Sequence, residues 1–141
     1  MQMTDWFLAN QDEAEQIASI VTTEERDFED WPHIEFPLIE LELMALSAAL
    51  QGADPAGESI LEKPLVWDEE GLCVARVKDA FIQALARVKP EGAEALAEAW
   101  GERIEDGPHE PEELHEFVSL LTDFARDAVA RGIPVIELRT F

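Results

Sequence analysis

The residues of this chain that could do chemistry are few. Glu112 and His115 are spaced i and i+3, which places them on one face of a helix, as in the ligand pairs of di-iron bundles. That architecture needs a second such pair and two more glutamates on facing helices, and no other Glu-x-x-His occurs in the sequence. We therefore expect His115 to be a surface histidine, and His109, Glu113 and His115 to form at most an adventitious cation site.

His33 with Glu35, and Cys73, are the other candidates. His33 and Glu35 would point to the same side of an extended segment, but a catalytic zinc site needs three protein ligands. Cys73 lies in an alternating run, where a small buried thiol is more common than a nucleophile. The sequence contains no P-loop, no dinucleotide-binding glycine motif and no G-x-S-x-G elbow. We therefore expect no metal site, no cofactor and no catalytic residue, with a small enzyme or metal-binding protein as an alternative.

Charge is the most unusual property of the sequence. It contains 32 Asp and Glu against 10 Lys and Arg, so the formal net charge is −22. A field of this sign opposes direct binding to nucleic-acid phosphates and to anionic membranes. It is compatible with a basic protein partner. Two alternatives stay open, a DNA-mimic protein and an acidity that serves only solubility or salt adaptation.

The segment EERDFEDWPHIEF, residues 24–36, combines this charge with aromatic side chains. In one interpretation Phe28 and Trp31 fold back onto the core and hold the segment as a loop. In the other, Trp31 is an exposed anchor ringed by carboxylates, as aromatic hot spots often are. The second interpretation makes the following residues candidates for partner binding: Glu24, Glu25, Asp27, Phe28, Glu29, Asp30 and Trp31.

Apolar periodicity predicts the elements that position these residues. We expect strands over 3–8 and 133–141, a brief extended segment over 33–36 and a hairpin over 64–76. We expect helices that begin at Asn10, at Pro37 and near Lys78, a fourth over 90–104, and the longest over about 111–131. Asn10 and Glu13 fit a capping box, and Gly52 and Gly132 fit helix ends.

These elements predict one α+β domain over residues 1–141, with about five helices packed on a small mixed sheet of four to five short strands. We expect the first and last strands to pair in the centre of the sheet, and Trp6, Trp67 and Trp100 to lie in the core. The single cysteine excludes an intramolecular disulfide. The acidic start of the chain lacks the pattern of a signal peptide, and no apolar run is long enough for a transmembrane helix. We therefore expect a cytoplasmic protein.

The C-terminal part of the chain resembles a known family. The helices VKDAFIQALARV and EGAEALAEAWGERI, followed by LHEFVSLLTDFARDAVARG and the terminal IPVIEL, look like the same region of small bacterial YfbM-like proteins of unknown function. The likeness covers about 65 residues and carries no functional residue. It implies an α+β fold and no particular chemistry.

Charge and the absence of catalytic motifs together favour a non-enzymatic protein-binding module. We expect it to recognise a basic protein, in the way that immunity proteins neutralise basic nuclease toxins. The acids would steer the partner in, and Trp31 or a neighbour would anchor it.

Overall fold

The computed structural model describes residues 3–22, 31–52, 59–68, 71–104 and 110–140. It contains five α-helices, two short 3-10 turns (η1 and η2) and five strands, so the predicted α+β fold is confirmed. In chain order the elements are β1 (Met3–Leu8), η1 (Gln11–Glu13), α1 (Ala14–Thr22), β2 (His33–Phe36), α2 (Glu40–Gln51), β3 (Leu61–Asp68), β4 (Leu72–Val77), α3 (Asp79–Ala86), η2 (Pro90–Gly92), α4 (Ala93–Arg103), α5 (Pro111–Arg131) and β5 (Val135–Thr140).

The strands form one sheet in the order β2-β1-β5-β4-β3. The predicted pairing of the first and last strands is confirmed, because β5 is the middle strand and pairs with β1. The predicted hairpin is β3 and β4, which pair across a turn where Gly71 has a φ of 115°. The prediction of a mixed sheet is wrong, since all four strand pairs are antiparallel. Between β4 and β5 the chain passes through α3–α5. Strand β5 then runs antiparallel to both of its neighbours, β1 and β4.

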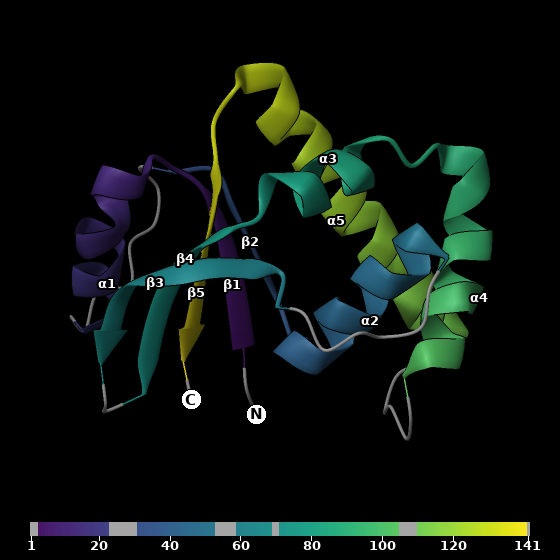
Figure 1. Cartoon of the computed structure of the whole chain (residues 1–141), viewed down its shortest axis with the longest axis horizontal. Helices are drawn as coiled ribbons and strands as arrows, with labels where there is room; N and C mark the ends of the chain where they lie inside the picture. The colour runs from purple at the N-terminus through teal and green to yellow at the C-terminus, as the bar shows by residue number, and fades with distance from the viewer. Residues whose placement is uncertain (1–2, 23–30, 53–58, 69–70, 105–109, 141) are drawn as a thin grey trace.

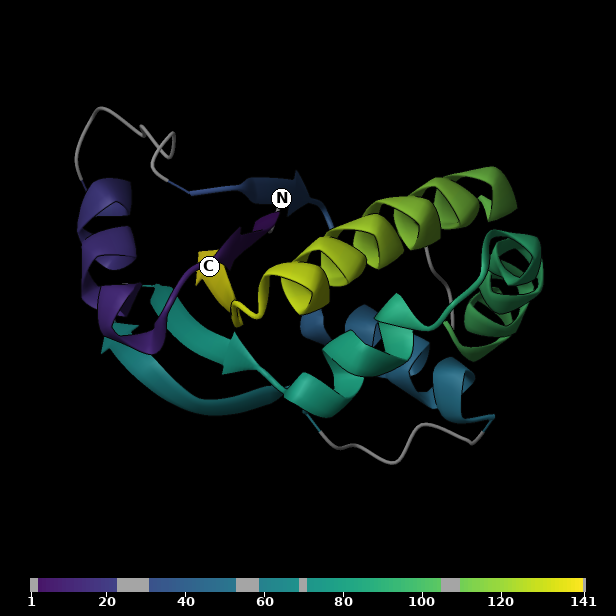
Figure 2. The same cartoon turned by 90° about the horizontal axis from the view of Figure 1, so that it is seen from above.

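Helices cover both faces of this sheet. Helix α1 lies on one side of the strands, and α2–α5 lie together on the other, which makes three layers (Figures 1 and 2). Side chains of β5 alternate between two hydrophobic clusters, with Ile136 and Leu138 in the cluster that contains α1 and Val135 in the larger one. The side chains of residues 135–139 on the middle strand are therefore all buried, whether they are apolar or charged.

Two of the three tryptophans predicted to be core residues are buried, and one is not. Trp6 and Trp100 are fully buried, and the ring of Trp6 packs edge-on against Phe36 at a centroid distance of 5.3 Å. The prediction for Trp67 is wrong, because its side chain is 61% exposed. Trp67 belongs to β3, one of the two edge strands of the sheet, and a pattern of alternation does not distinguish an edge strand from a central one.

The helix boundaries follow local signals closely. Helix α5 has the predicted bounds, and Gly132 ends it with a φ of 67°, a left-handed conformation that suits glycine. Helix α2 begins at Glu40 rather than at Pro37, because Ile39 is extended and the carbonyl of Leu38 accepts a hydrogen bond from the Thr4 hydroxyl at 2.7 Å. The extended entry therefore ties the start of α2 to strand β1.

Candidate functional site

Strand β5 carries two charged side chains into the layer between the sheet and α2–α5. Glu137 and Arg139 are two residues apart, so they share a face of the strand, and they are only 1% and 5% exposed. Trp6 of β1 lies opposite Glu137, and Cys73 of β4 lies opposite Arg139. A buried carboxylate and guanidinium at the centre of a small protein are unusual and need partners.

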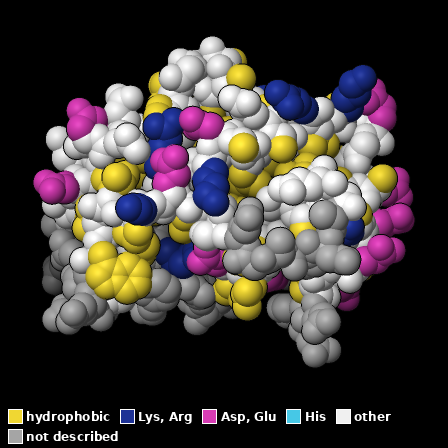
Figure 3. Space-filling model, viewed as in Figure 1, with side chains coloured by type: hydrophobic (Ala, Val, Ile, Leu, Met, Phe, Trp, Pro, Cys, Tyr) yellow, Lys and Arg dark blue, Asp and Glu magenta, His cyan; other side chains and the backbone are white. Residues whose placement is uncertain are grey.

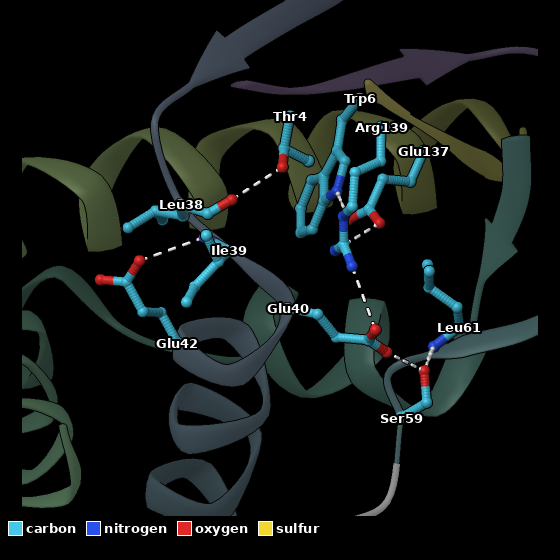
Figure 4. Close-up of polar contacts among 10 residues, drawn as sticks. All are labelled: Thr4, Trp6, Leu38, Ile39, Glu40, Glu42, Ser59, Leu61, Glu137 and Arg139. Carbon is cyan, nitrogen blue, oxygen red and sulfur yellow. Dashed lines mark hydrogen bonds and ion pairs between the residues drawn. The ribbon is translucent and has the colours of Figure 1, made fainter. Parts of the chain in front are cut away.

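Both oxygens of the Glu137 carboxylate have a donor. The Trp6 indole Nε1–H donates to Oε1 at 2.9 Å, and Arg139 Nη2 donates to Oε2 at 2.7 Å (Figure 4). Trp6 is itself enclosed by aromatic rings, with the centroid of Phe81 at 6.1 Å. The carboxylate is therefore isolated from water and depends on two donors.

Arg139 links this pair to helix α2. Its Nη1 donates to Glu40 Oε2 at 3.0 Å, and Glu40 is the first residue of α2. The Ser59 hydroxyl donates to the other oxygen of Glu40, and the amide N–H of Leu61, the first residue of β3, donates to Ser59 Oγ at 3.0 Å. We call Trp6, Glu40, Ser59, Glu137 and Arg139 the polar network (Figure 4). It joins the middle strand, the first turn of α2 and the start of β3.

The network holds two carboxylates and one guanidinium, so it lacks one positive charge when both acids are ionised. Burial raises the pKa of Glu137 to about 7, and the nearby charge of Glu40 adds to the rise. Arg139 and the Trp6 hydrogen bond oppose it. Glu137 therefore changes its protonation state near neutral pH.

The chemistry of these groups favours proton binding and structural support over nucleophilic catalysis. Cys73 is buried as predicted, and burial raises the pKa of its thiol, which keeps it in the unreactive thiol form. The Ser59 hydroxyl is engaged by Glu40 and by the Leu61 amide. Among the described residues, no group of three or more His, Cys, Asp or Glu side chains could hold a metal ion.

The sequence contained one signal for this network that our predictions missed. In VIELRT, Glu137 and Arg139 alternate with apolar residues, a pattern typical of a strand with one face in water. We expected the last strand to be central, and a central strand covered on both faces forces such polar residues into the interior. The alternation of polar and apolar residues in the last strand, taken with its predicted central place in the sheet, would have predicted that Glu137 and Arg139 form a buried ion pair.

Trp31 of the acidic segment is buried, and its burial supports the first of the two interpretations, in which it folds back onto the core. Its side chain is only 8% exposed. It packs edge-on against Phe7 at 6.3 Å, and its Nε1–H donates to Glu13 Oε2 at 2.7 Å. The interpretation of Trp31 as an exposed anchor is wrong, because its ring lies in the cluster beneath α1 and its polar atom is satisfied. The other candidates for partner binding lie outside the described residues: Glu24, Glu25, Asp27, Phe28, Glu29 and Asp30.

The Glu13 carboxylate accepts hydrogen bonds both from Trp31 and from the backbone at the start of the first helix. Its Oε1 accepts the amide N–H of Asn10 at 2.9 Å, half of the predicted capping box. The Asn10 amide and the Trp31 indole lower the pKa of this carboxylate. Because the folded state favours the ionised form, the contribution of Glu13 to stability is present above its ordinary pKa and is lost as the pH falls.

We expect Glu13→Gln to lower the free energy of unfolding at pH 7 by about 1–2 kcal/mol, because the two donors bond to different oxygens of Glu13 and the NH2 group of glutamine would face one of them. Urea denaturation measures this change, and Glu15→Gln, an exposed position in α1, is the matched control with an expected change within about 0.5 kcal/mol. The difference between wild type and Glu13→Gln should shrink below pH 4.5. Equal stability of the two variants at pH 7 would show that Glu13 does not hold this region.

Two of the three histidines considered as ligands, His33 and His115, lie at the surface. His33 is exposed at the edge of the sheet on β2, where its ring stacks on Phe7 at 5.5 Å. Glu35 is exposed as well, as expected for residues two apart in a strand. His115 is exposed on α5, as predicted, and His109 lies outside the described residues.

Exposed carboxylates gather at the helical end of the molecule. Residues 91–123 contain eleven acids and a single base, Arg103. Helices α4 and α5, which pack against each other, carry exposed glutamates that we call the acidic ridge: Glu94, Glu98, Glu102, Glu112 and Glu116. Figure 3 shows Asp and Glu side chains along the margin where α4 lies in Figure 1, whereas Lys and Arg are interspersed with other Asp and Glu on the rest of this face. The charge is therefore unevenly distributed over the surface.

Comparisons with protein-family models, with curated proteins and with solved structures found no match. The resemblance to YfbM-like proteins stays a prediction, since none of these comparisons bears on it. In the part of the chain that the structure describes, no helix combines the length and the apolar character needed to cross a membrane.

Proposed function

We propose that this protein is a cytoplasmic, non-enzymatic module that binds a basic protein partner through the acidic ridge. The main support is the density of exposed carboxylates on α4 and the first half of α5. Glu94, Glu98 and Glu102 follow one another at i, i+4 and i+8, so they line one side of α4.

This arrangement is costly for an isolated helix. Like charges four residues apart destabilise a helix by about 0.2–0.5 kcal/mol per pair, and α4 contains two such pairs among Glu94, Glu98 and Glu102. A basic partner would relieve the repulsion and would be attracted over a distance of about 10 Å at moderate salt. An acidic ridge with this role mainly increases the rate of association and the specificity of binding.

The ridge predicts a salt-sensitive interaction that depends on where the charge lies. In the triple variant Glu94→Gln, Glu98→Gln and Glu102→Gln, we expect about tenfold weaker retention of basic proteins at low salt, because the partner loses its closest opposite charges. The measurement is a pull-down from native lysate at about 50 mM and about 500 mM salt, followed by mass spectrometry.

The matched control neutralises three exposed acids on the other side of the molecule, Asp12→Asn, Glu15→Gln and Glu35→Gln. It changes the net charge by the same amount and should retain the partner as the wild type does. If no basic protein is retained at low salt, or if the two triple variants lose it equally, the ridge is not the binding surface.

A further inference from the structure

We propose that the polar network is a proton-binding device that couples the protonation state of Glu137, on the middle strand, to the first turn of α2 and the start of β3. This goes beyond partner binding, because it assigns a regulatory role to residues that do not belong to the acidic ridge. It rests on a continuous series of contacts from Glu137 through Arg139 and Glu40 to Ser59.

Each oxygen of the Glu137 carboxylate accepts one hydrogen bond, so a second lone pair on either oxygen can take a proton. Oε1 accepts from Trp6 and Oε2 accepts from Arg139, and a proton on Glu137 weakens these hydrogen bonds because the neutral acid is a poorer acceptor than the carboxylate. A proton on Glu137 removes the negative charge that Arg139 Nη2 faces, and the guanidinium then has Glu40 as its remaining carboxylate in the network. Proton binding therefore strengthens the attraction between Arg139 and the first residue of α2.

The groups around Glu137 support a proton equilibrium near neutral pH. On β5 it faces Arg139, on β1 the indole of Trp6, and on α2 the carboxylate of Glu40. Strand β4 contributes Ala75 opposite Glu137 and the buried thiol of Cys73. One positive charge thus faces two carboxylates, and burial raises the pKa of Glu137 to about 7.

Hydrogen bonds of three indole groups provide internal probes for this proposal. Trp6 Nε1–H is bonded to Glu137, Trp31 Nε1–H to Glu13, and Trp100 Nε1–H to the backbone carbonyl of Glu42 at 2.8 Å. In ¹⁵N-labelled protein with assigned resonances, the Trp6 indole signal should titrate with a midpoint near pH 7. Trp31 should shift only in acid, since the pKa of Glu13 is lowered, and Trp100 should not titrate between pH 5 and 9.

Coupling to β3 has its own probe, the backbone amide of Leu61, which donates to Ser59. We expect the Leu61 amide to titrate with the same midpoint as the Trp6 indole. Both titrations should disappear in Glu137→Gln. In Glu40→Gln the midpoint of Trp6 should move to lower pH, because the charge of Glu40 raises the pKa of Glu137.

Three results would overturn the proposal. A Trp6 indole that is flat between pH 5 and 9 means that Glu137 does not exchange its proton in this range. A Trp6 titration without a Leu61 titration means that the network does not transmit it. A titration that persists in Glu137→Gln assigns it to another group. If Glu137→Gln does not fold, the first two results can still be obtained from the titrations of the wild type and of Glu40→Gln.

Discussion

Replacing Arg139 by methionine is expected to lower the free energy of unfolding by about 3–5 kcal/mol, one of the two largest effects expected for this protein. The substitution removes the positive charge that faces Glu137 at 2.7 Å and leaves a carboxylate that is 1% exposed without compensation. Removing one partner of a buried ion pair costs this much because the remaining charge stays out of water. Urea denaturation at pH 8, where Glu137 of the wild type is largely ionised, measures the loss, since in the variant Glu137 either stays buried as an unpaired charge or takes up a proton that it would not bind in the unfolded state.

A second substitution distinguishes the lost ion pair from lost packing. In Arg139→Met with Glu137→Gln, no charge is buried at position 137 and the amide oxygen still accepts from Trp6, so we expect about 2 kcal/mol to be recovered. Arg131→Met is the surface control, since Arg131 pairs with Asp127 where both side chains are exposed, and it should cost less than about 1 kcal/mol. A double variant that is no more stable than Arg139→Met would show that the uncompensated charge is not the cause.

The second large effect is a dependence of stability on pH that comes from Glu137. Its pKa in the folded protein is about 7, above the ordinary value of 4.5, so between these values the folded state binds the proton and the unfolded state does not. The stability contributed by this proton is present below pH 4.5 and is lost as the pH rises through 7. The loss between pH 4.5 and 8 corresponds to about 3 kcal/mol.

The difference between wild type and Glu137→Gln isolates this contribution, because the other acids titrate alike in both proteins. The stability of the wild type relative to Glu137→Gln should fall as the pH rises from 5 to 8. Chemical denaturation at a series of pH values gives the difference at each point. A constant difference over this range would mean that Glu137 keeps one protonation state.

Local signals in the sequence were sufficient to predict α5 but not the start of α2. The stripe of Leu114, Val118 and Leu121 with glycine at position 132 predicted α5 correctly, since periodicity and capping are properties of neighbouring residues. The start of α2 was misplaced because a contact with Thr4, 34 residues away from Leu38, holds Leu38 and Ile39 outside the helix. Long-range hydrogen bonds of this kind leave no local pattern.

Burial of individual side chains depended on the order of the strands, which periodicity does not contain. Trp67 and Glu137 both lie in alternating strands, yet the tryptophan is exposed at the edge and the glutamate is buried at the centre. Trp31 was undecided because its burial requires both Phe7 and Glu13 in position. The acidic ridge could be foreseen in part from the spacing of Glu94, Glu98 and Glu102 once α4 was predicted.

Binding through the acidic ridge is tested most directly by the salt dependence of the complex with a basic protein retained in the pull-down. The dissociation constant of that purified partner, measured by calorimetry at several salt concentrations, should rise steeply with salt for the wild type. For the variant with Glu94, Glu98 and Glu102 replaced by glutamine it should be about tenfold higher at low salt and rise less steeply. A dissociation constant that is the same for both proteins at every salt concentration would contradict binding through the ridge.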